Sequence, residues 1–163
     1  MSIEVDFVPM SGQEADSDLI DGAIGEGSAF HETFGVYAEG VSPTTAVLAP
    51  SWRDRLIPLP DPASGAIGLC LDPHDLCASK LIAGRPKDHG FVEAAVSHQL
   101  VDPLIVEERL TATDHLAVDS AVATIRRYAP LGLTDSRRPS WRANREQAIR
   151  DRRNRVNPKP ESP

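Results

Sequence analysis

Glu4 and Asp6 are the first residues whose types and spacing indicate chemistry. They lie in residues 2–8, where β-branched and aromatic residues alternate with acidic ones and favour a strand that ends at Pro9. Side chains two residues apart on a strand share a face, so the two carboxylates repel unless a cation lies between them. Mg²⁺ prefers such oxygen ligands and keeps waters for a substrate phosphate. On this pair alone a solvated acidic face is the favoured interpretation, because acid-x-acid is a common string.

Three cations fall within eight residues further along the chain: Lys80, Arg85 and Lys87. The chain has fourteen arginines but three lysines, so two lysines in this stretch stand out. Lysine is a compact point charge that suits a phosphate. The segment also opens a helix, whose backbone N–H groups favour anions. We expect a polyphosphate site here; the alternative is that Lys80 extends along its own helix and Asp88 caps the following one.

Strands come first and helices later, which predicts an α+β fold with a helical C-terminal half. A small mixed β-sheet is expected, covered by an early helix and by the later helices. Asp-Pro pairs at 72–73 and 102–103 give helix starts, and Gly84 gives a helix end. The expected strands are residues 2–8, 34–38, 45–48, 55–59 and 67–71, and the expected helices are 14–24, 72–83, one opening at Pro86, 102–110 and 114–128.

Charge is distributed unevenly, which predicts two parts. Residues 1–125 carry six basic and twenty acidic groups, whereas residues 126–163 carry eleven basic and four acidic groups. The body should repel nucleic acid, and the tail should attract nucleic acid or an acidic protein surface. The alternative is a solvated end. We therefore predict one domain over residues 1–128 and a basic, partly disordered arm over 129–163, with a basic helix at 141–155.

Composition excludes several classes of protein. No apolar stretch approaches the ~20 residues of a membrane helix, so no membrane contact is expected. No export signal follows Met1. Two cysteines, Cys70 and Cys77, do not make a disulfide scaffold or a zinc site and are expected to be buried, reduced thiols. A cytoplasmic location is expected.

Residues 68–110, GLCLDPHDLCASKLIAGRPKDHGFVEAAVSHQLVDPLIVEERL, carry a specific resemblance. The segment resembles a family of small bacterial nucleotidyltransferase-like proteins, grouped under a domain of unknown function and related to abortive-infection toxins of toxin–antitoxin systems. Members have a DPHDLAxSKLxAGRxKDxxFV stretch and then LVDPxxLxxRL. The upstream pieces IEVDFVP, DLIDGAIGEGSAFHETFGVYAEGV and WRDRL are also similar, so the resemblance covers about residues 2–115.

The resemblance implies a truncated polymerase-β-like nucleotidyltransferase fold that binds Mg²⁺ and a nucleoside triphosphate. It assigns strand carboxylates to the metal and a helix lysine to the triphosphate. Either of two aspartates is then the candidate proton acceptor, and two weaker candidates add a third carboxylate and a phosphate contact. These residues are Glu4 and Asp6 for the metal, Lys80, Arg85 and Lys87 for phosphate, Asp6 or Asp88 for the proton, and more weakly Glu39 and His74.

The sequence departs from that family in one important respect. Such enzymes place a Gly-Ser loop before the carboxylate strand, whereas here Met1 stands five residues before Asp6 and Glu4 replaces the usual aspartate. Losing one preorganised donor costs roughly 3 kcal/mol of transition-state stabilisation. Two hypotheses follow. One is an Mg²⁺-dependent transfer of a nucleotidyl group to RNA, such as tRNA, or to protein; the other is a non-catalytic binding module, a toxin–antitoxin component that uses its basic tail to bind nucleic acid or a cognate antitoxin.

Two further expectations concern the assembly of the site and of the protein. The enzyme hypothesis requires the carboxylates of residues 4 and 6 to face Lys80 across a gap that fits a metal-bound polyphosphate. A sheet that lacks its first strand leaves an open edge, and open edges pair with other chains. We therefore expect a homodimer in which that edge is covered.

Overall fold

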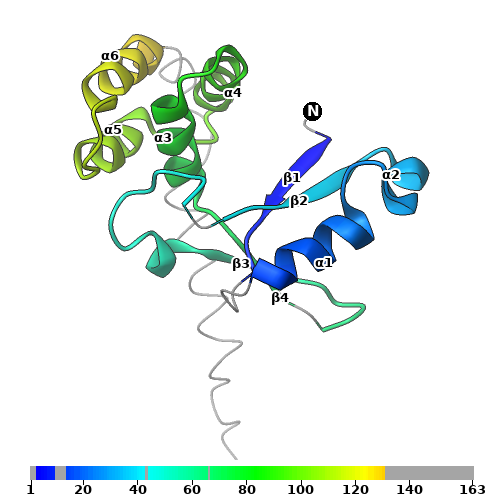
Figure 1. The fold of residues 1–163 in the computed structure, drawn as a ribbon. Helices are drawn as coiled ribbons and strands as arrows, with labels where there is room; N and C mark the ends of the chain where they lie inside the picture. Colours follow the sequence, from blue (N-terminus) through cyan, green and yellow to red (C-terminus); the bar gives the residue numbers. More distant parts are fainter. Residues whose placement is uncertain (1–2, 10–13, 43, 66, 131–163) are drawn as a thin grey trace, which may run out of the picture. The chain divides into compact units, whose positions relative to one another are not determined.

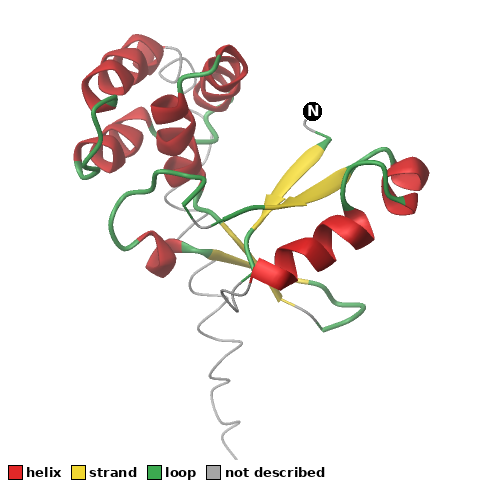
Figure 2. Cartoon of the chain, in the orientation of Figure 1, coloured by secondary structure: helices red, strands yellow, loops and turns green. Residues whose placement is uncertain are grey.

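The computed structural model describes residues 3–9, 14–42, 44–65 and 67–130, and the chain divides into two compact units, residues 1–46 and 47–163. Figure 1 follows the chain by colour and Figure 2 separates its helices from its strands. The described residues form six α-helices, a short 3-10 helix and four strands. The predicted α+β class is confirmed.

The first unit is built on a two-stranded parallel ladder. Strand β1 (Glu4–Phe7) pairs with β2 (Tyr37–Gly40), and helices α1 (Glu14–Ile24) and α2 (Ala29–Phe34) connect them. The register sets Glu4 opposite Tyr37 and Asp6 opposite Glu39. Consecutive parallel strands need a crossover, which these helices supply.

Gly40 at the end of β2 allows this strand to lie directly against α1. A Cβ atom at this position would lie 2.8 Å from Ser17 Cα, so a larger residue would push the strand away from the helix. The Gly40 N–H donates a 2.6 Å hydrogen bond to Asp21 Oδ1. This contact fixes the residue next to Glu39, and therefore helps to position that carboxylate.

The second unit opens with the 3-10 helix Trp52–Arg55 and an antiparallel hairpin, and continues with four helices. The local chemistry predicted for α3 is confirmed, since the Asp72 side chain accepts a hydrogen bond from the His74 N–H and Gly84 ends the helix at φ 64°. The elements of this unit are β3 (Ile57–Pro60), β4 (Ile67–Cys70), α3 (Pro73–Ala83), α4 (Pro86–Ser97), α5 (Pro103–Thr111) and α6 (Val118–Tyr128).

The hydrophobic core of the second unit lies between its four helices, because α3 contacts α4, α5 and α6. The prediction that both cysteines are buried is confirmed for Cys77 and wrong for Cys70, which is exposed on β4. Burial raises the pKa of the Cys77 thiol to about 12, so this cysteine stays a neutral thiol. The largest fully buried apolar side chains belong to Leu110, Ile125, Val92, Val96 and Val106.

No helix in the described part of the chain has the length and apolar character needed to cross a membrane.

Several predicted elements differ from the structure. The strand predicted at 45–48 is wrong, because the described residues there form a turn and irregular chain. The strand predicted at 34–38 begins later, as β2, because a short helix precedes it. Ser28 caps that helix, the Phe30 and Phe34 rings lie 4.7 Å apart on it, and Gly35 ends it at φ 68°.

Three boundaries also shift. Residues 52–55 form a 3-10 helix before β3, and the last described helix begins at Val118 rather than at residue 114. The strands pair as two two-stranded sheets, one parallel and one antiparallel. The division at 46/47 falls inside the domain predicted over 1–128. The predicted arm lies outside the described residues from 131 onward, and so does the helix predicted at 141–155.

Candidate metal centre and basic cluster

Three carboxylates of the first unit form an acidic cluster: Glu4, Asp6 and Glu39. One oxygen of each lies within 4.8 Å of the other two. The β1–β2 register sets Asp6 opposite Glu39, and Glu4 lies two residues before Asp6. Asp6 and Glu39 are exposed and Glu4 is half-buried. The structure therefore brings the two predicted metal ligands together with the weaker third candidate.

The carboxylates of this cluster repel one another, and this repulsion contributes to a raised pKa of Glu39. A hydrogen bond with the Glu4 side chain raises this pKa above its ordinary value, and partial burial and the charges of Glu4 and Asp6 raise it further. A hydrogen bond between two carboxyl groups needs a shared proton. Burial and the neighbouring carboxylates also raise the pKa of Tyr37. A cation bound between these carboxylates would relieve the repulsion that helps to raise the pKa of Glu39.

The donor set of the acidic cluster fits a hard divalent cation. Mg²⁺ takes oxygen ligands and usually binds through one or two carboxylates while keeping several waters. Two of these three carboxylates are open to solvent, which leaves room for waters and for a substrate phosphate. Zn²⁺ is less well matched, because no His or Cys ligand belongs to this group.

A basic cluster in the second unit gathers around Asp88, which is 1% exposed. Arg85 Nε donates a 2.7 Å hydrogen bond to one Asp88 oxygen, and Lys80 Nζ donates to the other at 3.4 Å. Lys80 Nζ also lies 4.9 Å from the centre of the Phe91 ring. Two cations around one carboxylate leave an excess positive charge, which is the property expected of an anion site.

Asp88 itself is better suited to positioning than to proton transfer. Burial alone would raise its pKa, but hydrogen bonds and charge from Arg85 and Lys80 hold the pKa below its ordinary value. A carboxylate of low pKa is a weak base at neutral pH. Which of the two aspartates accepts the proton stays a prediction. Lys87, the third predicted cation, is exposed in the first turn of α4.

His74, the weaker phosphate candidate, is buried and joins two helix starts. Its Nδ1 lies 2.7 Å from Asp72 Oδ1, and its Nε2 accepts a 3.1 Å hydrogen bond from the Asp102 N–H. Both ring nitrogens are thus engaged inside the protein. This geometry supports a structural role, since neither nitrogen is directed at a phosphate.

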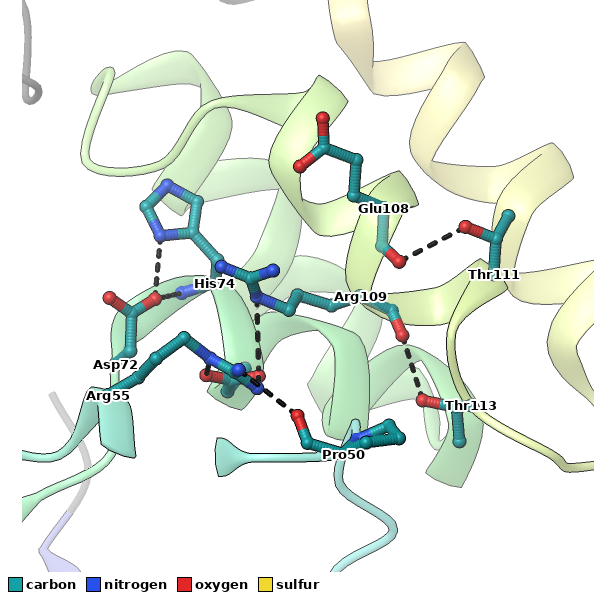
Figure 3. A network of polar contacts seen from close by, with 9 residues as sticks. Pro50, Arg55, Asp72, His74, Glu108, Arg109, Thr111 and Thr113 are labelled. Carbon is teal, nitrogen blue, oxygen red and sulfur yellow. Dashed lines mark hydrogen bonds and ion pairs between the residues drawn. The ribbon is translucent and has the colours of Figure 1, made fainter. Parts of the chain in front are cut away.

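One polar network, which is centred on Asp75, was not predicted from the sequence. The Asp75 side chain is fully buried and accepts two hydrogen bonds from Arg55, at 2.7 Å from Nε and 2.8 Å from Nη2. Arg109 Nε lies 3.6 Å from the same carboxylate. Figure 3 shows the two arginines side by side. The bond to Asp75 is the largest cause of the raised pKa of Arg55. The string WRDRL was the sequence signal that Arg55 carries a role.

The acidic and basic clusters belong to different units, each of which the structure describes by itself. The expectation that Lys80 faces the carboxylates of β1 therefore stays a prediction.

A family model described as "Nucleotidyltransferase of unknown function (DUF6036)" matches residues 16–129. The match includes Glu39, Lys80, Arg85 and Asp88 and begins after β1. No curated protein and no solved structure matches the chain significantly.

Proposed function

We propose that this chain, which belongs to the family of nucleotidyltransferases of unknown function, is an Mg²⁺-dependent enzyme. It transfers a nucleotidyl group from a nucleoside triphosphate to a hydroxyl of RNA or protein, with Mg²⁺ bound at the acidic cluster. The observation that carries the proposal is the convergence of Glu4, Asp6 and Glu39 within 4.8 Å on two paired strands. Three carboxylates held this close repel one another, and a divalent cation bound between them would offset that repulsion.

Each carboxylate has a distinct part in this proposal. Glu4 and Glu39 hold the metal, which when bound neutralises phosphate charge and stabilises the attacking and leaving oxygens. Asp6 holds the metal and accepts the proton of the acceptor hydroxyl. The acceptor oxygen bonds to the α-phosphorus, the bond from that phosphorus to the bridging oxygen breaks, and pyrophosphate leaves. Atoms and charge then balance without a further reactant.

The basic cluster is proposed to contact the phosphates. Asp88 holds Lys80 and Arg85 in place and neutralises one of their two charges, so one positive charge is left for an anion. Lys80 reaches past the Phe91 ring, and its side chain is 27% exposed, so its ammonium group is accessible to a ligand. Removing Lys80 should therefore raise the KM for the triphosphate more than it lowers kcat.

The basic arm, residues 129–163, is proposed to hold the acceptor. Its nine basic and four acidic residues give it the opposite sign to the rest of the chain. Contacts of this kind bind RNA phosphates and weaken as salt rises. Binding to a cognate antitoxin protein through the same arm and formation of a homodimer remain proposals.

The test is incorporation of label. The full chain is incubated with each α-phosphate-labelled triphosphate, Mg²⁺ and either total RNA or total protein. We expect label in one acceptor fraction, none after chelation of Mg²⁺, and none with Asp6→Asn. Asp18→Asn, an exposed carboxylate of α1, is the matched control and should stay active. Nucleotide binding without incorporation for every triphosphate and both acceptors would overturn the enzyme and favour a non-catalytic binding module.

A further inference from the structure

A pocket in the second unit has no part in the proposed chemistry. Its volume is about 500 Å³, and its lining comes from two segments, residues 47–53 and the pair Thr113 and Asp114. Pockets that hold small organic ligands have volumes of about 300–1,000 Å³. The pocket is therefore large enough for one nucleoside.

Trp52 and Arg53 give this pocket a flat, cationic surface. The Arg53 guanidinium carbon lies 4.5 Å from the centre of the Trp52 ring, so the two groups form a cation–π pair. Both residues line the pocket, and Trp52 is half-buried while Arg53 is exposed. Nucleobases stack on aromatic rings and on guanidinium planes. A planar heterocycle is thus the ligand shape that this wall favours.

The second lining segment offers a hydrogen-bond acceptor. Asp114 is exposed and lines the pocket, and an ionised carboxylate only accepts hydrogen bonds. Thr113 beside it donates its hydroxyl proton to the Arg109 carbonyl at 2.8 Å. Bases with an exocyclic amino group (guanine, adenine and cytosine) can donate to such a carboxylate, whereas uracil has no amino group.

Both walls are tied to one buried ion pair, which makes the pocket preformed. Arg55 donates to the Pro50 carbonyl at 3.1 Å while it binds buried Asp75. Arg109 lies against the same carboxylate, and its Nε is a buried nitrogen without a hydrogen-bond partner among the described residues. Figure 3 shows the bonds from Arg55 to Pro50 and from Thr113 to Arg109. A preformed site loses less conformational freedom on binding.

We propose that this pocket binds the base of a nucleotide, stacked on Trp52 and Arg53, with Asp114 accepting a hydrogen bond from an exocyclic amino group. The base could belong to the triphosphate or to the RNA acceptor, and that assignment rests on the proposed function. The binding itself does not, because it uses none of the residues of the acidic cluster.

The test uses fluorescence of Trp52. Trp141→Phe leaves Trp52 as the sole tryptophan, since the chain has two. The variant is titrated in EDTA with GMP, AMP, CMP and UMP, with ribose 5-phosphate as the ligand without a base and free tryptophan amide as the optical control. We expect saturable quenching by GMP, AMP and CMP, about tenfold weaker binding of UMP, and none of ribose 5-phosphate.

Substitutions locate the binding. Asp114→Asn should remove the discrimination against UMP, because an amide both donates and accepts. The control Asp119→Asn, which removes an exposed carboxylate of α6, should keep the weaker binding of UMP. If the Trp141 variant fails to fold, calorimetry on the full native sequence with the same ligands replaces fluorescence. Absence of binding, equal binding of ribose 5-phosphate, or unchanged discrimination in Asp114→Asn would overturn the inference.

Two further arms separate this inference from the proposed function. Asp6→Asn should keep base binding at the pocket while it loses nucleotidyl transfer. A failure of the base-binding prediction can therefore be told apart from a failure of the proposed function. Triphosphates carry the same bases and should compete with GMP in either case, so relative affinity assigns the pocket. Tighter competition by a triphosphate than by a short single-stranded RNA assigns the pocket to the donor, and the reverse order assigns it to the acceptor. Both results support the pocket, and competition by neither overturns it.

Discussion

Asp6 and Glu39 are partners in the register of the parallel β1–β2 ladder, which places two carboxylates from distant parts of the chain on neighbouring strands. Glu4 joins them through the two-residue repeat of β1. The cluster therefore depends on a single strand pairing, and Gly40 and Asp21 hold β2 against α1 beside it.

Glu39→Gln should stabilise the metal-free protein, because it removes one of three like charges and keeps a hydrogen-bonding side chain. The same variant should lose the rise in Tm that Mg²⁺ gives the unaltered protein. Thermal unfolding in EDTA and in Mg²⁺ measures both effects, with Asp18→Asn as control. A variant whose Tm still rises with Mg²⁺ as in the unaltered protein would contradict metal binding by Glu39.

Metal affinity should fall as the pH is lowered. The pKa of Glu39 is raised, so protonation of this carboxylate competes with metal binding as the pH falls. For the same reason the metal-free fold has its full stability below the unfolded-state pKa of Glu39 and loses part of it as pH rises through the folded-state value. Mg²⁺ titrations from about pH 7 down to about pH 4.5, with proton release recorded, test whether the affinity for Mg²⁺ falls as predicted. Affinity that is constant over this range would be the contrary result.

How far the sequence predicts the structure depends on how local the signal is. Helix α3 is predicted closely because Asp72, Pro73 and Gly84 mark its ends within the segment itself. Helix α2 is missed because it has six residues and its signals, Ser28 and Gly35, also suit a loop. The strand predicted at 45–48 has β-branched residues but no partner strand among the described residues.

The candidate site divides in the same way. Strand spacing places Glu4 and Asp6 on one face, but their metal role and the weaker candidate Glu39 come from the family resemblance. The contact of Glu39 with this pair depends on the β1–β2 register, which spacing within one segment does not contain. The role of Asp75 required Arg55, twenty positions earlier in the chain, to reach the first turn of α3. Local pattern therefore finds the pair on one strand and leaves the network unseen.

Asp75→Asn should destabilise the second unit by about 3–5 kcal/mol, because two guanidinium groups would share a partly buried space without a counter-charge. Glu108→Gln, an exposed carboxylate on α5, should change stability by less than about 0.5 kcal/mol. Urea unfolding monitored by helical circular dichroism compares the two. A loss at Asp75 no greater than at Glu108 would show that the ion pair is not structural.

Asp88→Asn should cost about 1–3 kcal/mol at neutral pH, because its carboxylate accepts two charged hydrogen bonds. We expect a loss near the lower end of this range, because the Arg85 side chain is 59% exposed and solvent screens its interaction with Asp88. Because the folded-state pKa of Asp88 is lowered, this stability is present above the unfolded-state pKa and is lost as pH falls through the folded-state value. The control is Glu93→Gln on the exposed side of α4. Equal stability of both variants across pH would refute the claim that the Asp88 carboxylate stabilises the fold.

His74→Phe should lower stability by about 1–3 kcal/mol through loss of its two hydrogen bonds. Transfer activity per folded molecule should not change, since both ring nitrogens bind inside the protein. Kinetics and unfolding measured on the same preparation separate the two roles. A variant of normal stability with a raised KM for triphosphate would instead make His74 a phosphate ligand.

Binding of Mg²⁺ to the acidic cluster is the central claim, and calorimetric titration of Mg²⁺ into the full chain with a non-hydrolysable triphosphate tests it most directly. The account predicts saturable binding to the unaltered protein and to Asp18→Asn, and loss of that binding in Asp6→Asn. Binding that Asp6→Asn leaves intact, or no binding to the unaltered protein, would contradict it.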